Sequence, residues 1–239
     1  GPQSLAVNGP LTDEAVFKII GGMTNLQSLD ATRAAATPAA MRELARLPAL
    51  KSLQLFKADI PDEALQVISG FPALEQLRMA QTRVGDDGIR HLGALKSLRA
   101  IELTDCNRVS DQGVAVLATL PDLVFLKVWG PQVTDTSLAE IGKLKKLRTL
   151  ALNDTRITDA GLPSLAGLEN LEELQVLRTG VSDAGLDAIA GLKKLRSLSL
   201  RGTAISDAGL AKLVALPALK LLDISETQSP GVTDASAAS

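Results

Sequence analysis

The chain repeats two hydrophobic patterns in turn. Between Thr149 and Asn153, leucines alternate with small or polar residues, which is the two-residue period of a strand with one buried face. Between Leu162 and Leu168, apolar residues recur every three or four positions, which is typical of a short helix with one buried stripe. Neither element can bury its apolar side alone. The pattern therefore predicts one strand–turn–helix unit that must stack against others.

This unit recurs at a nearly constant spacing of 24 residues. An incomplete copy, with its strand leucine at Leu5, comes first. The motif Leu-x-x-Leu-x-Leu then begins at Leu26, Leu50, Leu74, Leu98, Leu123, Leu147, Leu171, Leu195 and Leu219. One gap is 25 residues, and the extra residue falls in the turn 106–109. A fixed period in this range indicates stacked units, and it predicts ten strands, centred near residues 6, 30, 54, 78, 102, 127, 151, 175, 199 and 223.

Stacked units of this kind predict an α/β solenoid. Neighbouring strands would pair in parallel at about 4.8 Å, and the helices would cover the other side of the sheet. Since helices are wider than strands, we expect a curved stack with the strands on the concave face and the helices on the convex face. We interpret residues 1–2 as the scar of an expression tag, residues 3–228 as one repeat domain, and residues 229–239 as a frayed half-repeat or linker.

The composition narrows the function without naming it. The 25 Lys and Arg residues nearly balance 27 Asp and Glu residues, for a net charge of −2, which argues against a protein devoted to nucleic acid or to an anionic membrane. No apolar run reaches the roughly 18 residues needed to span a bilayer, so we expect no membrane insertion. The compartment stays open, with the cytoplasm slightly favoured.

The residues needed for catalysis or metal binding are scarce. The only histidine, His91, is expected on the solvent-exposed outer face of a helix rather than in a catalytic or metal site. The only cysteine, Cys106, is expected to pack as a small buried residue, and a single cysteine excludes an intrachain disulfide. Pairs such as Ser182-Asp183 could suggest calcium, but they fall where helices begin and are explained by helix capping. We predict no enzyme, no metal and no cofactor.

The consensus LxxLxLxxTxITDAGLxxLxxL resembles the leucine-rich repeat. It is similar to the ITDAGL-bearing variety found in bacterial proteins and to the cysteine-containing repeats of F-box proteins. The fifth unit, with Cys106 at the signature position, is nearest to the latter. The resemblance implies a right-handed, horseshoe-shaped solenoid that binds protein partners, usually on its concave sheet. Threonine replaces the asparagine common after the strand, as at Thr155 and Thr179, so a continuous asparagine ladder is not expected.

The strand positions that flank the buried leucines predict the concave surface. The chain has five aromatic residues, and three of them fall at such positions. Aromatic and arginine side chains dominate protein–protein hot spots. The predicted partner-binding residues are Phe56, Arg78, Glu102, Phe125, Lys127, Trp129, Asn153, Leu177 and Arg201. In the alternative interpretation, Trp129 folds over the small Ala151 and only covers the sheet.

We therefore predict a non-enzymatic, monomeric scaffold that binds a protein or peptide on its concave sheet. The alternative is a structural or regulatory segment of a larger protein, or a self-association module. A basic cluster from Lys143 to Arg148 recurs at residues 193–196, but Glu169 and Glu172 lie between the two. Such alternation of sign favours a solvated, screened edge over a nucleic-acid track.

Overall fold

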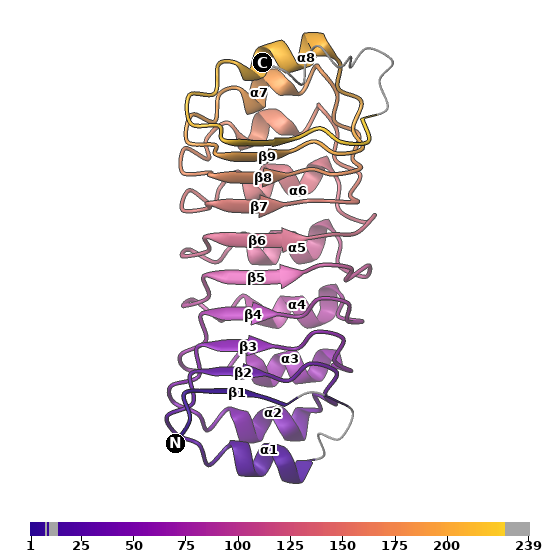
Figure 1. The fold of residues 1–239 in the computed structure, drawn as a ribbon. Coiled ribbons are helices and arrows are strands. Elements are labelled where there is room, and N and C mark those ends of the chain that lie inside the picture. Colours follow the sequence, from indigo (N-terminus) through magenta and orange to yellow (C-terminus); the bar gives the residue numbers. More distant parts are fainter. Residues whose placement is uncertain (8, 10–13, 228–239) are drawn as a thin grey trace.

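A computed structural model describes residues 1–7, 9 and 14–227 of the chain. The predicted half-repeat or linker at residues 229–239 lies outside these described residues. Within them the chain forms one parallel sheet whose strands follow one another in sequence order, as predicted (Figure 1). The strands are β1 (Ser4–Ala6), β2 (Ser28–Asp30), β3 (Ser52–Gln54), β4 (Gln76–Arg78), β5 (Ala100–Leu103), β6 (Phe125–Val128), β7 (Thr149–Ala151), β8 (Glu173–Gln175), β9 (Ser197–Ser199) and β10 (Leu221–Asp223).

Each strand is paired in register with the next copy of itself. Leu150 lies beside Leu174, and Leu174 beside Leu198, so equivalent side chains form columns across the sheet. The longer fifth unit keeps this order, since Ile101 still pairs with Leu126. A side chain on one strand is therefore next to its counterparts one repeat before and after it.

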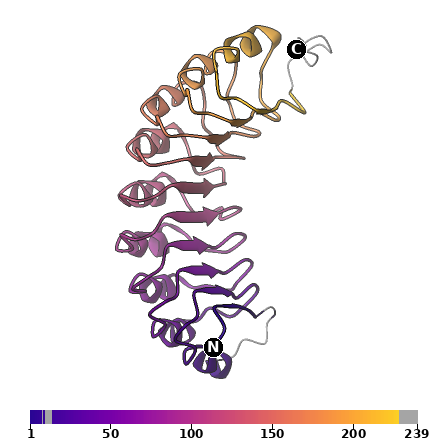
Figure 2. The ribbon, with the colours of Figure 1, turned by 60° about the vertical axis from the view of Figure 1, so that its left-hand side comes forward.

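A layer of short helices covers the other face of the sheet. They are α1 (Glu14–Ile20), α2 (Pro38–Leu44), α3 (Asp62–Ile68), α4 (Asp86–Leu92), α5 (Asp111–Leu117), α6 (Asp135–Ile141), the 3₁₀ helix η1 (Leu162–Leu165), α7 (Leu186–Ile189) and α8 (Asp207–Leu213). The stack curves, with the strands along its hollow side and the helices outside (Figure 2). The seventh unit differs from the expected α-helix, since Pro163 has no backbone N–H to donate and only a 3₁₀ turn forms.

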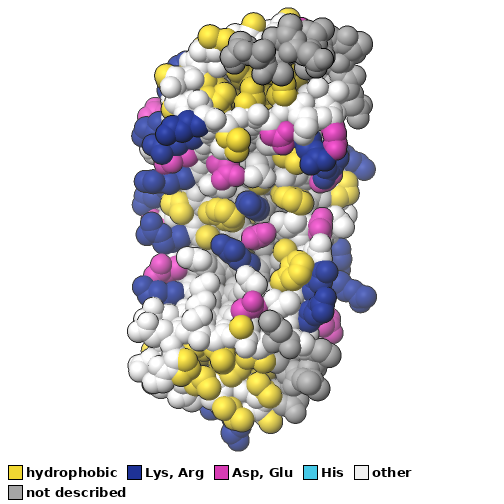
Figure 3. Space-filling model, in the orientation of Figure 1, with side chains coloured by type: hydrophobic (Ala, Val, Ile, Leu, Met, Phe, Trp, Pro, Cys, Tyr) yellow, Lys and Arg dark blue, Asp and Glu magenta, His cyan; other side chains and the backbone are white. Residues whose placement is uncertain are grey.

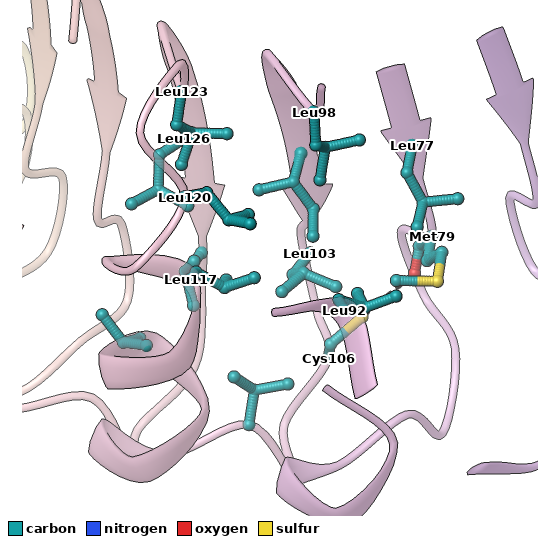
Figure 4. Close-up of a cluster of buried hydrophobic side chains, with 14 of the residues drawn as sticks. Leu77, Met79, Leu92, Leu98, Leu103, Cys106, Leu117, Leu120, Leu123 and Leu126 are labelled. Carbon is teal, nitrogen blue, oxygen red and sulfur yellow. Dashed lines mark hydrogen bonds between the residues drawn. The ribbon is translucent and has the colours of Figure 1, made fainter. Parts of the chain in front are cut away.

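A column of buried leucines lies between the sheet and the helices. Leu126 and Leu152 are fully buried, like the equivalent leucines of the neighbouring units. Cys106 is also fully buried, as predicted, beside Met79 among these leucines (Figure 4). Its burial raises the pKa of the thiol, which keeps the sulfur protonated and unreactive. His91 corrects the expectation of a solvent-exposed residue: it is half-buried, because α4 packs against α5 of the next unit.

The aspartates at the helix starts bind across units. The hydroxyl of Thr158 caps its own helix by accepting from the backbone N of Ala160, as predicted for the capping pairs. The neighbouring Asp159, by contrast, accepts hydrogen bonds from the backbone N and hydroxyl of Ser182 in the next unit. Equivalent bonds start from Asp86, Asp111, Asp135 and Asp183. We call this series the aspartate ladder.

Candidate partner-binding surface

Charged side chains meet in the middle of the concave face. The register aligns Arg78 of β4 with Glu102 of β5, and Glu102 with Lys127 of β6. Arg78 Nε lies 3.9 Å from Glu102 Oε2. Figure 3 shows this side of the molecule, where hydrophobic side chains lie among charged ones over the central strands. The sequence-predicted charges are thus brought together in one row across three strands.

Two phenylalanines on this face lie beside lysines. Lys127 Nζ is 5.2 Å from the ring centroid of Phe125 on the same strand. Lys57 Nζ is 5.0 Å from the ring centroid of Phe56. Both distances allow a cation–π interaction. Lys57 was not predicted, because it lies one position beyond the strand pattern and takes a left-handed backbone conformation that turns the chain.

Phe56, Arg78 and Glu102 also line a shallow depression of about 160 Å³, together with Gln54 and Ala80. The depression joins three strands whose sequences are far apart in the chain. It combines an aromatic wall with one positive and one negative group, a mixture typical of protein recognition surfaces.

Trp129 follows β6 and is half-buried. Its indole Nε1 is covered by protein and has no hydrogen-bond partner among the described residues. Ala151, which the sequence placed in the hollow, is completely buried. These features fit the alternative in which the Trp129 ring lies partly over the sheet, so only the rest of its surface is open to a partner.

Asn153 differs from the other predicted contact residues because only 1% of its surface is exposed. Its Oδ1 accepts a hydrogen bond from the backbone N of Leu177, at 3.0 Å, and its Nδ2 donates to Gln175 Oε1. Asn153 therefore joins two units and is not exposed on the hollow. Leu177 itself is half-buried and lies at the open face of β8.

Arg201 is not brought into the central group. It follows β9, three strands from β6, and forms an ion pair with Glu226. The hydrogen bond from Arg201 lowers the pKa of the Glu226 carboxyl, so this pair stays charged at neutral pH. The central surface therefore comprises Phe56, Arg78, Glu102, Phe125, Lys127 and Trp129, and we call it the aromatic surface.

A second hollow lies at the edge where the central strands begin, and sequence analysis missed it. It has a volume of about 540 Å³ and is lined by Arg99, Val124, Lys146, Arg148 and Asn170. Only the spacing of Arg99 and Arg148, each directly before a strand, could have indicated it. No cluster of three or more His, Cys, Asp or Glu residues suited to a metal was found in the described part of the chain. None of its helices is long and apolar enough to cross a bilayer.

Comparison with known proteins agrees with this architecture. A family model described as "Leucine Rich repeat" matches residues 94–118, 143–166 and 191–214. The matched segments each run through a turn and the helix start of one unit, with the spacing seen in the structure. The chain is a leucine-rich-repeat protein.

Solved leucine-rich-repeat structures share its fold. Internalin C2 from Listeria monocytogenes aligns with a TM-score of 0.62 at 19% identity, covering 93% of this chain and 80% of the other. Internalin F from the same organism aligns with a TM-score of 0.59 at 18% identity, covering 97% and 82%. No curated protein matches the sequence. At these identities the likeness shows the fold alone, and the leucine-rich repeats support a protein-interaction scaffold in general.

Proposed function

We propose that the protein is a non-enzymatic scaffold that binds a protein or peptide partner on the aromatic surface. The observation that supports this most is the placement of Phe56 and Phe125 with Arg78, Glu102 and Lys127 on one face of a sheet held by backbone pairing. A preordered sheet loses little conformational freedom on binding, so its side chains can contribute more of their interaction free energy. Monomeric behaviour and the absence of nucleic-acid binding stay predictions.

The partially covered Trp129 fits this role. Leaving a buried N–H without an acceptor costs about 1–3 kcal/mol. A partner that supplied an acceptor after a small rotation of the ring would remove that cost. Since Trp129 is the only tryptophan, its intrinsic fluorescence reports directly on the proposed surface.

A peptide selection tests the proposal with any partner that fits the surface. A random peptide library displayed on phage would be selected against the wild-type protein, and enriched peptides would be titrated by calorimetry. We expect them to shift the Trp129 emission, and to bind at least tenfold more weakly to a Phe125→Ala/Trp129→Ala double variant. Such a loss is about 1.4 kcal/mol or more, the size expected of hot-spot residues.

Ile19→Ala is the matched control, because Ile19 is an exposed apolar residue on helix α1, away from the sheet. It should bind the selected peptides like the wild type. Peptides that bound the double variant and the wild type equally would contradict the proposed surface. Light scattering on the same samples would show self-association, which is the competing interpretation.

A further inference from the structure

We propose that the hollow lined by Arg99, Val124, Lys146, Arg148 and Asn170, hereafter the cationic hollow, binds an acidic segment of the partner protein. This inference rests on the proposed function and deepens it by naming the chemistry of the partner. It follows from the local charge, from the state of the cations in the structure, and from the continuity of the hollow with the aromatic surface.

Positive charge gathers around the cationic hollow although the whole chain is slightly acidic. The four turns at residues 93–99, 118–124, 142–148 and 166–172 contain six cations and three carboxylates. The cations are Lys96, Arg99, Lys143, Lys145, Lys146 and Arg148, and the carboxylates are Asp122, Glu169 and Glu172. Figure 3 shows Lys and Arg side chains along the edge from which the strands begin. No carboxylate belongs to the described lining of the hollow itself.

The cations of the hollow remain available to a ligand. Within the described chain, the guanidinium of Arg99 takes part in no hydrogen bond or ion pair and the residue is exposed. Lys146 pairs with Asp122 at 2.5 Å, and Arg148 pairs with Glu172 at 3.3 Å. Both pairs are exposed, and exposed ion pairs are weak and salt-sensitive. Carboxylates of a partner could therefore replace them, with Arg99 as the first point of contact.

The cationic hollow continues directly into the aromatic surface. Arg99 and Arg148 precede the first residues of β5 and β7, and Val124 precedes Phe125 of β6. From Val124 to Trp129 the chain advances by five residues, or roughly 17 Å for an extended strand. An extended partner segment of about six residues could therefore place apolar side chains on Phe125 and Trp129 and acidic ones in the hollow.

The pattern of charge favours a short acidic peptide over nucleic acid. A nucleic acid presents one charge at every phosphate, and following the edge in either direction would bring phosphates to Asp122 or to Glu169 and Glu172. A peptide can instead concentrate its carboxylates in the hollow. Extension of the basic edge beyond the hollow adds nothing to such a ligand, so binding should depend on local cations rather than on net charge.

Fluorescence anisotropy with synthetic peptides tests the inference. The labelled probes are EEEGGLF and its reverse FLGGEEE, since the direction of the segment is open, and the neutral counterparts QQQGGLF and FLGGQQQ. At about 20 mM salt, we expect one acidic probe to bind at least tenfold more tightly than its neutral counterpart. Because exposed charges are screened over about 10 Å at 0.1 M salt, this advantage should shrink at 200 mM.

The decisive variant is Arg99→Glu/Arg148→Glu, which should abolish the advantage of the acidic probe. Arg83→Glu/Arg156→Glu is the control, because it changes the net charge equally in turns that follow the strands, and it should keep that advantage. Circular dichroism would confirm that both variants are folded. Equal binding of acidic and neutral probes, or equal losses in both variants, would overturn the inference. So would a single-stranded oligonucleotide that binds more tightly than the peptide and is lost with the same variant.

The proposed function fails or survives separately in the same experiment. Trp129→Ala should weaken the acidic and the neutral probe alike, because it removes an apolar contact. If Trp129→Ala weakens both probes while the Arg99→Glu/Arg148→Glu variant has no effect, the aromatic surface stands and the cationic hollow is excluded as a binding site. If only the charge variant has an effect, the hollow binds acids without the aromatic surface.

Discussion

Asp159 Oδ1 accepts a hydrogen bond of 2.8 Å from the backbone N of Ser182, the residue that begins the equivalent turn 23 positions later. The same carboxylate explains the glycine of the repeated DAGL motif. A Cβ on Gly185 would lie 2.5 Å from Leu162 Cδ1 and closer still to Asp159 Oδ1. Aspartate in one unit and glycine in the next are therefore parts of one contact. In the third unit the small residue is Ala64, and there the preceding unit has Pro38 in place of the aspartate.

Gly185→Ala should therefore destabilise the protein. Alanine favours helix over glycine by about 0.5–1 kcal/mol where there is room. Here overpacking should win, and we expect a net loss of about 1–3 kcal/mol in the free energy of unfolding by urea titration. In an Asp159→Ala background the cost of Gly185→Ala should be smaller, because one of the two obstructing groups is gone. Equal costs in both backgrounds would show that the carboxylate is not the cause.

Acid should weaken the aspartate ladder. Burial raises the pKa of Asp111, but hydrogen bonds from Ser137 and Thr134 outweigh this effect and hold the pKa below its ordinary value of 3.8. A carboxyl with a depressed folded-state pKa contributes stability above its unfolded pKa, and that contribution is lost as pH falls through the folded value. We expect unfolding free energy to fall below about pH 4 for this reason.

The matched variant is Asp111→Asn, whose stability should be lower at pH 7 and depend less on pH between 5 and 2. Glu63→Gln makes the same change in net charge at an exposed site and should keep the wild-type slope. Denaturant titrations at each pH measure both. Identical slopes for Asp111→Asn and the wild type would contradict the assignment.

Leu152→Ala should cost roughly 2–5 kcal/mol of stability by the usual cavity argument. The side chain is fully buried in the leucine column between the sheet and the helix layer. Val214→Ala is the control, because 86% of Val214 is exposed. Denaturant melting measures both variants, and a loss below half a kilocalorie for Leu152→Ala would be inconsistent with the packing described above.

Arg33→Gly should leave stability unchanged or raise it by up to about 1 kcal/mol. Arg33 has a φ of 62°, in the left-handed region that costs non-glycine residues roughly 1–2 kcal/mol. Glycine removes this strain but adds conformational entropy to the unfolded chain, which offsets part of the gain. Arg33→Ala removes the same side chain without relieving the strain, so the glycine variant should have the higher melting temperature. The reverse order would exclude backbone strain at this turn.

The periodic leucines predicted the fold well because both of its layers repeat with one register. The threonine after each strand was also interpreted correctly as part of a turn: Thr155 donates to the carbonyl of Leu152 within its own unit. The aspartate ladder was not predicted, because Ser182-Asp183 has the same sequence whether the carboxylate caps its own helix or binds the next unit. Only the spacing between units in three dimensions decides between these two uses.

The surface was predicted less completely than the core. Alternation along a strand gives the side of the sheet to which a residue belongs, but not whether a neighbour covers it. Asn153 was expected in the hollow for this reason and is buried by its bonds to β8. The cationic hollow was missed because Arg99 and Arg148 are separated by a whole unit, and the side chains in sequence between them belong to the core or to the helices.

The position of Pro38 has a mechanical consequence. In the described chain the ladder bonds join units only from Asp86 onward, while α2 has a proline where the later helices begin with aspartate. Under tension or mild heating, the coil should peel from its first three turns, and the remainder should open as a block. Strands β5, β6 and β7 belong to that block, so the surface formed by Phe125 and its neighbours would outlast partial unravelling of the front of the molecule.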